Sequence, residues 1–319
     1  MATVVSSEAI NDAFVVFCGI LVIFFKFGFT FFATGKTAEL SSANVLFLSV
    51  ADSFISLFAY WLHGYAFAFG DGYRFIGAKY FLTLNNPKFS HFFFNYARCA
   101  VATSLVMGAI VERAEPVGYL VSSYLLSGFV LPVASHWFWH PQGHFYLHGS
   151  AYPVQDSAGS GVVFGVGATA AMCACFIIGK RSNVGPKLPR QGHSLPFTVL
   201  GACIQMISFL GFTIGAHGYF IAEGDGQITG LTAVNTLLAG SSAGLYGMLY
   251  QRLRKQKYSV QMLIDSSLAG MVAVCAGASS YFPGLSLFCG ATSALVFTAV
   301  QQLIIKLKYD DPVNVIPSK

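Results

Sequence analysis

The chain has little charge for its length. Of its 319 residues, 10% are charged and 55% are hydrophobic, and the mean hydropathy is +0.63. A soluble domain carries charge on about a quarter of its residues, so this composition excludes an ordinary soluble protein. It predicts an all-α protein that crosses a membrane several times. The net charge of +5 follows the placement of loops, and we expect no nucleic-acid partner.

Motifs of catalysis and of cofactor binding are also missing. The chain contains no phosphate-binding loop, no HExxH motif and no CxxC pair, so we expect neither an enzyme nor a cofactor. Four histidines recur at every fourth residue, at His136, His140, His144 and His148. On a continuous helix they would share a face and could bind zinc. Because Pro141 and Gly143 interrupt the segment and no Cys or acid completes the set, we expect no metal site.

Targeting and disulfide signals are weak. Met1 to Asp12 contains no basic residue, so we expect no cleaved signal peptide and take the first span as its own insertion signal. The cysteines lie mostly inside apolar runs, where we expect small, polarizable core residues. They are Cys18, Cys99, Cys173, Cys175, Cys203, Cys275 and Cys289.

Long apolar runs dominate what is present. A helix needs about 20 apolar residues to cross the hydrocarbon, and this length predicts nine spans. They are residues 12–35, 43–69, 90–111, 117–138, 157–179, 195–216, 228–250, 261–281 and 284–306. Small residues repeat through 157–171, 239–244 and 266–278, as close helix packing in lipid requires.

Basic residues predict the orientation of these spans. If the N-terminus lies outside, the inner loops contain 13 of the 18 Lys and Arg residues: Lys36, Arg113, Lys180, Arg181, Lys187, Arg190, Arg252, Arg254, Lys255, Lys257, Lys306, Lys308 and Lys319. The positive-inside rule therefore places the N-terminus outside and the C-terminus inside. The basic loop 180–194 is a candidate contact for anionic lipids.

Several stretches, in order along nearly the whole chain, resemble the ammonium transporter (Amt/Mep/Rh) family, and most of all its Amt branch. The most specific are LPVASHWFWHPQG and DSAGSGVVF; the others are GYRFIGAKYF, GAIVERAE, IIGKR, LGFTIGA, AVNTLLAGSSAG, DSSLAGMVAVCAGASSYF and KYDDPVNVIP. The resemblance implies eleven helices in two inverted five-helix halves, usually assembled as a trimer with one pore per subunit. In the family, a Trp and a Ser hold ammonium in an outer vestibule. Two Phe rings and an apolar lumen with two facing His follow.

Three residues match the family pattern and four positions depart from it. Asp156 matches the acid that supports the cation site, Trp139 matches the vestibule Trp, and Phe212 matches one gate ring. The departures are Arg98 at the other gate ring, Ala216 at the vestibule Ser, Phe164 at the first pore His, and Lys319 at about the second His. The resemblance therefore predicts a divergent, shortened member, without the family's tenth and eleventh helices or either pore His.

The departures have physical consequences. Phe164 cannot move a proton, so a His relay cannot operate there. Arg98 at mid-membrane depth costs at least about 2.5–3.5 kcal/mol on insertion scales, so it needs a cavity or a partner: Asp156, a lipid phosphate or a neighbouring subunit. The alternative is snorkelling to the outer interface. For Lys26 we expect snorkelling to the inner face, and for Asp52 and Asp265 structural hydrogen bonding.

Two functions compete on this basis. We expect one membrane domain over 1–319, with five helices in 1–180 and four in 195–319. The favoured hypothesis is a member that has lost relay-based ammonium transport and is a structural or accessory subunit of a larger membrane complex, with lipids and other subunits as partners. The alternative is a working transporter or channel of altered selectivity, for ammonium or a small neutral solute, that could form a homotrimer. Nothing in the sequence names the membrane.

Overall fold

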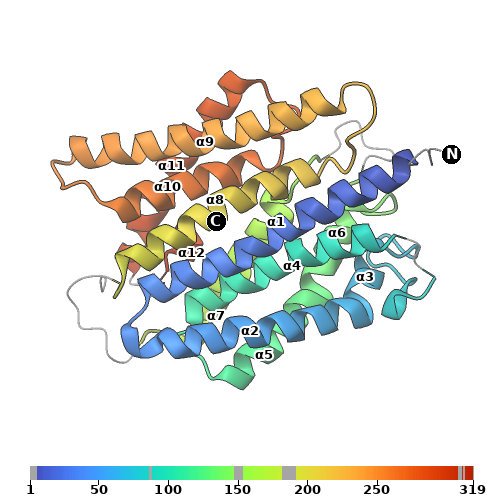
Figure 1. The fold of residues 1–319 in the computed structure, drawn as a ribbon. Helices are drawn as coiled ribbons and strands as arrows, with labels where there is room; N and C mark the ends of the chain where they lie inside the picture. The colour runs from blue at the N-terminus through green and yellow to red at the C-terminus, as the bar shows by residue number, and fades with distance from the viewer. Residues whose placement is uncertain are drawn as a thin grey trace.

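The fold is a bundle of helices, most of them long and roughly aligned (Figure 1). The computed structural model describes residues 6–85, 88–146, 154–181, 192–307, 311 and 313–318. These residues contain no β-strand, only an isolated bridge between Gly72 and Gly77. In the first part of the chain the spanning elements are α1 (Ser7–Lys36), α2 (Ser42–Ala59) with η2 (Tyr60–Gly64) and α3 (Tyr65–Phe69), α4 (Phe89–Ile110), α5 (Pro116–Leu125) with η4 (Leu126–Val130) and α6 (Leu131–Trp139), and η5 (Ser160–Gly165) with α7 (Val166–Ile178).

The second part of the chain adds four long helices and one short one. They are α8 (Leu195–Gly215), α9 (Asp225–Leu253), α10 (Val260–Val274), α11 (Pro283–Leu307) and α12 (Val315–Ser318). Two single-turn 3₁₀ helices, η1 (Glu39–Ser41) and η3 (Phe81–Thr83), lie in connections. The segments η2, η4 and η5 are π-helical turns within spans, a geometry that often occurs at functional sites.

The hydropathy pattern predicts where the helices lie, because each predicted span overlaps a helix or a run of helices. Seven of the described helical runs are long and apolar enough to cross a membrane, which makes this an integral multi-pass membrane protein. The helix α9 has the length but is less apolar, and α10 has only 15 residues. The predicted number of spans and their orientation stay predictions.

Close backbone approach holds neighbouring helices together. The helices α1 and α8 pack along their lengths, and α9, α10 and α11 form a second packed group (Figure 1). A Cβ on Gly201 of α8 would collide with the Phe32 backbone of α1, and a Cβ on Gly290 of α11 would collide with the Ala239 carbonyl of α9. Small residues at these crossings therefore permit the contact, as expected for helices in lipid.

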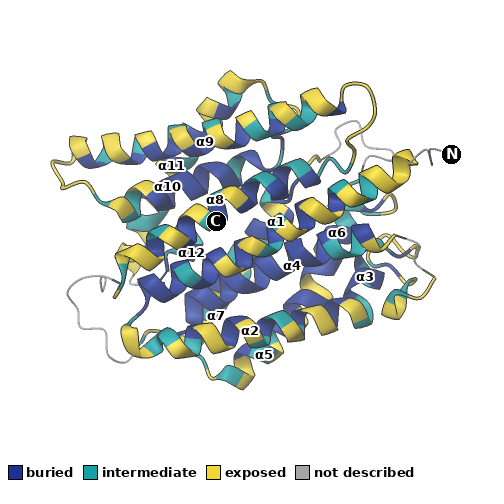
Figure 2. Cartoon of the chain, viewed as in Figure 1, coloured by how far each residue is buried: buried dark blue, intermediate teal, exposed yellow. Residues whose placement is uncertain are grey.

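The helix α4 forms the centre of the bundle and positions the site described below. In α4, 94% of the most apolar 18-residue window is buried, whereas α11 has 22% of its window buried (Figure 2). Outer helices expose large apolar side chains such as Phe176 and Phe288, as lipid-facing surfaces do. Polar residues within this buried window of α4 are thus held inside protein.

Two buried ion pairs cross-link the helices on the side of the bundle away from the N-terminus. Lys26 of α1 lies 2.5 Å from Asp52 of α2 and is 3% exposed, so the expectation that Lys26 snorkels to the interface is wrong. Asp52 also accepts hydrogen bonds from Thr103 and Ser123. Its predicted structural role is therefore seen in the structure.

The second ion pair joins the end of α1 to α10 and to the last described segment of the chain. Lys36, at the end of α1, contacts Asp265 of α10 at 2.6 Å and donates to the Val313 carbonyl at 3.0 Å. Asn314 also donates to Asp265. The short α12 that follows packs against α4, α7, α10 and α11. Lys319, at the expected second pore His, lies outside the described residues.

Candidate functional site: a vestibule above a plug of phenyl rings

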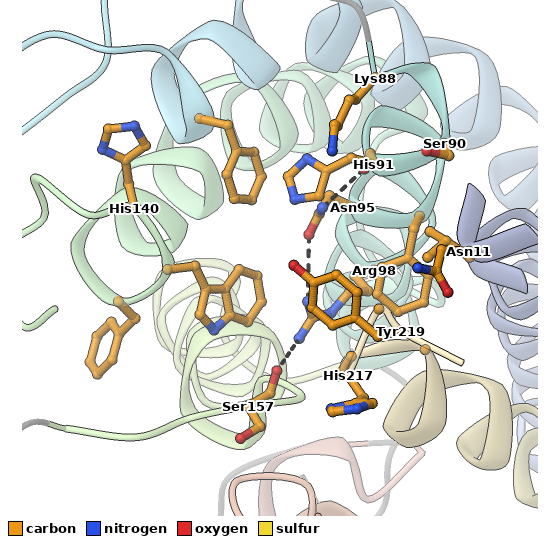
Figure 3. A pocket seen from close by; sticks show the side chains of 18 of the residues that line it. Asn11, Lys88, Ser90, His91, Asn95, Arg98, His140, Ser157, His217 and Tyr219 are labelled. Carbon is orange, nitrogen blue, oxygen red and sulfur yellow. Dashed lines mark hydrogen bonds between the residues drawn. The ribbon is translucent and has the colours of Figure 1, made fainter. Parts of the chain in front are cut away.

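A cavity of about 1040 Å³ opens at the end of the bundle where the chain begins. Its walls come from the first turns of α1, from α3 and α4, from the end of α6, and from the segments 154–157 and 215–219 (Figure 3). Glu8, Lys88 and Tyr219 line its exposed rim. We call this cavity the vestibule. Trp139, Asp156, Arg98 and Ala216, four of the positions singled out in the sequence, line it.

Arg98 lies on the floor of the vestibule and is 5% exposed. Its guanidinium carbon is 3.8 Å from the centroid of the Trp139 ring and 5.4 Å from those of Phe94 and Phe212. Such cation–π contacts compensate for lost hydration. The side chain thus faces a cavity, and the alternative of snorkelling to the outer interface is wrong.

Hydrogen bonds fix the edge of the same guanidinium. Nη1 donates to Asn95 Oδ1 at 3.4 Å and Nη2 donates to the Ser157 carbonyl at 3.2 Å (Figure 3). Asn95 is itself oriented by donating to the His91 carbonyl at 2.9 Å. The partners of Arg98 in this subunit are therefore aromatic faces and neutral oxygens.

Asp156 acts on Arg98 as a nearby negative charge without a direct ion pair, and its carboxylate has a second role. Its two carboxylate oxygens accept four backbone N–H groups, from Gly159, Ser160, Gly161 and Val162, at 2.8–2.9 Å. These are the orphan donors at the start of η5 and α7, where a negative charge also complements the helix dipole. The Asp156 carbonyl accepts the Trp139 indole N–H at 2.6 Å. Asp156 therefore supports the vestibule through the backbone and the Trp139 ring, and no direct ion pair with Arg98 occurs among the described residues.

A cluster of phenyl rings lies next to Arg98, which it contacts through Phe212. Phe164 is fully buried, and its ring centroid lies 5.4 Å from Phe209, 5.2 Å from Phe212 and 5.9 Å from Phe25. Phe25 and Phe209 meet edge to face at 5.3 Å, an arrangement that aromatic pairs favour. We call these four rings the aromatic plug. All four have 0% exposure.

Sequence reasoning identified half of the aromatic plug. Phe164 and Phe212 follow from the family pattern, whereas Phe25 and Phe209 were missed. Phe209 precedes Phe212 by three residues on α8 and so shares a helix face with it, a signal that was present in the sequence. Phe25 comes from α1, and nothing in its local sequence distinguishes it from neighbouring phenylalanines.

The remaining positions singled out in the sequence lie in the vestibule wall or make structural contacts. Ala216 follows the last residue of α8 and is half-buried in the vestibule wall, where its methyl group offers no hydrogen bond. His136 is buried between the carbonyls of Ala68 and Tyr73, and its ring stacks on His140 at 4.5 Å. Burial, with His136 adding to it, holds the pKa of His140 below its ordinary value. No group of residues suited to a metal ion occurs in the described part of the chain; His148 lies outside that part.

Comparison with known proteins agrees with this architecture. The sequence model of the "Ammonium Transporter Family" matches residues 13–318. "Putative ammonium transporter 1" of Caenorhabditis elegans is 31% identical over 96% of this chain and 60% of its own length. "Ammonium transporter 1 member 3" of Solanum lycopersicum is also 31% identical, over 97% of this chain and 71% of its own length.

Solved structures share the fold. A "Sensor Amt Protein" superposes with a TM-score of 0.88 at 24% identity, covering 98% of this chain and 79% of that one. Mep2 of Candida albicans superposes with a TM-score of 0.85 at 22% identity, covering 96% and 69%. The chain thus spans between about 60% and 80% of the length of these relatives. The family match, the relatives and the vestibule geometry agree, and the chain belongs to the ammonium transporter family.

Proposed function

We propose that this chain is a non-conducting member of the family, one that has lost ammonium transport by proton relay and is a structural or accessory subunit of a membrane assembly. The aromatic plug carries the proposal. Its four fully buried rings occupy the region below the vestibule. Phenyl rings offer no group that accepts or donates a proton, so they support neither a relay nor a hydrated path.

Arg98 adds an electrostatic obstacle above the plug. Its guanidinium lies against Trp139, the residue expected to hold the substrate cation. Two like charges 4 Å apart repel by about 4 kcal/mol at an effective dielectric constant of 20. An arriving ammonium ion would meet this repulsion where the family offers attraction.

A second candidate function rests on the retained features of the vestibule. Trp139 and Asp156 line a cavity that opens to the surface, and the buried Phe212 ring contacts Arg98 on its floor. This arrangement favours an altered transporter or channel for ammonium or a small neutral solute.

Uptake of radiolabelled methylammonium into proteoliposomes separates the two functions. We expect uptake by the purified chain to equal that of empty liposomes, while a conducting family member measured in parallel gives a clear signal. Saturable uptake by the native chain that is lost in Trp139→Leu would establish the transporter and refute the non-conducting proposal. Trp139 is the better probe than Asp156, because removal of Asp156 would also disturb the start of η5.

The assembly role has its own test. Native mass measurement of the chain, extracted from its source membrane in a mild detergent, gives its stoichiometry. We expect co-extracted polypeptides in a fixed ratio. A homotrimer of this chain alone would contradict the accessory-subunit proposal.

A further inference from the structure

The vestibule floor carries a buried positive charge that makes no direct salt bridge among the described residues, although Asp156 acts on it through space. Only 5% of the surface of Arg98 is exposed, and no carboxylate lies within ion-pair distance of it among the described residues. Asp156, the acid of the vestibule floor, uses both oxygens on four backbone N–H groups. A buried charge in this state is costly unless a partner arrives.

The other charged groups of the vestibule are engaged near its rim. Glu8 pairs with Lys88 at 3.5 Å, and both side chains are exposed. Asp12 accepts the Ser90 hydroxyl at 2.6 Å, and His217 contacts Asp225 at 3.0 Å. Positive charge on the floor is therefore contributed by Arg98.

The guanidinium retains donors that have no protein acceptor. Of its five N–H groups, one on Nη1 meets Asn95 and one on Nη2 meets Ser157. Nε is buried and has no hydrogen-bond partner in the described part of the chain. Buried donors are satisfied in most structures. Nε is enclosed, so a ligand in the vestibule would instead meet the second N–H groups of Nη1 and Nη2, which have no acceptor among the described residues.

We propose that the vestibule binds a small oxyanion of the carboxylate class at Arg98. The faces of the guanidinium are covered by Trp139, Phe94 and Phe212, so a ligand approaches its edge. A planar carboxylate matches two parallel N–H groups of that edge, and such bidentate pairs are among the strongest charge-assisted hydrogen bonds.

The charges that line the vestibule are mixed, with the carboxylates of Glu8, Asp12 and Asp156 beside the cations of Lys88 and Arg98, so binding of an anion depends on the local donors around Arg98. The side chains of Asn11, His91 and Tyr219 also line the vestibule (Figure 3), and each can donate a hydrogen bond. The cavity of about 1040 Å³ leaves room for a ligand and several waters. The proposal goes beyond the loss of transport, since it assigns the vestibule a ligand of opposite charge.

Isothermal titration calorimetry of the full chain in a nonionic detergent tests the site. The probes are sodium acetate, inorganic phosphate and ammonium chloride, at constant ionic strength. We expect saturable binding of acetate, weaker binding of phosphate, and no saturable heat from ammonium. Ammonium binding that acetate does not displace would overturn the proposal.

Matched arginine variants locate the binding. Arg98→Gln should weaken acetate binding by at least about tenfold, the loss expected for a charge-assisted hydrogen bond. Arg98→Lys keeps the positive charge but loses the paired N–H donors of the guanidinium, and should bind acetate with intermediate affinity. Arg74→Gln, an exposed arginine outside the vestibule, should bind as the native chain does. Equal acetate binding in Arg98→Gln and Arg74→Gln refutes the site.

Two measurements keep the result interpretable. Gel filtration and thermal unfolding identify a variant that fails to fold, and Arg98→Phe, which places an apolar ring among Phe94, Phe212 and Trp139, then replaces Arg98→Gln. Native mass spectrometry distinguishes a lipid headgroup from a soluble ligand. If neither acetate nor phosphate binds, and an anionic lipid that co-purifies with the native chain is lost in Arg98→Gln, the acceptor is a lipid phosphate and the soluble-oxyanion proposal is wrong.

Discussion

At the scale of single residues, the proposed loss of transport rests on two side chains that would obstruct a cation path by different physical means. Arg98 would oppose a cation through its charge, and Phe164 stands where the family resemblance leads us to expect a proton acceptor. Phe212 connects them, because its ring contacts the guanidinium at 5.4 Å and the Phe164 ring at 5.2 Å. Replacing either residue alone therefore leaves the other obstacle, so we regard the two as one closed element.

The aromatic plug should contribute strongly to stability. Phe164→Ala removes a fully buried ring that packs on three others, and such a cavity costs about 3–5 kcal/mol. Phe288→Ala is the matched control, since Phe288 is 65% exposed on the outside of α11. Thermal unfolding in detergent should show a large drop in Tm for Phe164→Ala and a small one for Phe288→Ala. Equal shifts would mean that the plug is loosely packed.

At the scale of elements, Asp156 organises the start of η5 and α7. Asp156→Ala leaves four backbone N–H groups without their acceptor and should destabilise the chain by about 2 kcal/mol, the upper end for helix caps. Asp156→Asn keeps an acceptor oxygen and should cost less. Asp71→Ala, which removes an exposed carboxylate paired to Lys79, should change the stability little, because solvent screens an exposed ion pair. If Asp156→Ala and Asp71→Ala unfold at the same temperature, the capping role is refuted.

The Lys26–Asp52 pair ties α1 to α2, α4 and α5. Lys26→Met leaves a fully buried carboxylate without its cation, which costs about 3–5 kcal/mol. Adding Asp52→Leu removes that uncompensated charge, so the double variant should be more stable than Lys26→Met. Thermal unfolding of the two single variants and the double variant measures the coupling. A double variant less stable than Lys26→Met would contradict a charge-based cost.

Hydropathy predicts the helices well because lipid demands about 20 apolar residues per span, but it cannot predict contacts made across the bundle. Residues 261–281 were expected to form one span, yet α10 ends at Val274. Asn235 of α9 donates to the carbonyls of Ala278 and Tyr281 and so stabilises the turns that follow α10. Likewise Lys26 finds Asp52 on another helix, and local sequence shows neither partner.

Some residues of the candidate site could likewise be predicted from the sequence, whereas their contacts could not. Asp156, Trp139 and Phe212 could be found from motifs, because each lies in a characteristic stretch of sequence. The saturation of Asp156 by backbone donors and the stacking of Arg98 on Trp139 depend on how η5, α4 and α6 meet. Those contacts could be identified only in the three-dimensional structure.

At the scale of the whole molecule, the direction in which the vestibule faces remains a prediction from basic residues. Glu8 lies at the vestibule rim, at the start of α1, and Lys255 follows the end of α9 in a segment rich in basic residues. The positive-inside rule places Glu8 outside and Lys255 inside. A ligand would then reach Arg98 from the outer solution.

Single-cysteine labelling tests this orientation in spheroplasts that express the chain. Cys173 and Cys203 are exposed and Cys289 is half-buried, so these three are first replaced by Ser. A membrane-impermeant maleimide should then label Glu8→Cys in sealed spheroplasts and Lys255→Cys only after permeabilisation. The reverse pattern would place the vestibule on the inner side, where cytosolic anions rather than external ones would reach Arg98. Labelling of both positions before permeabilisation would mean that the chain inserts in mixed orientations, which would contradict the orientation predicted from its basic residues.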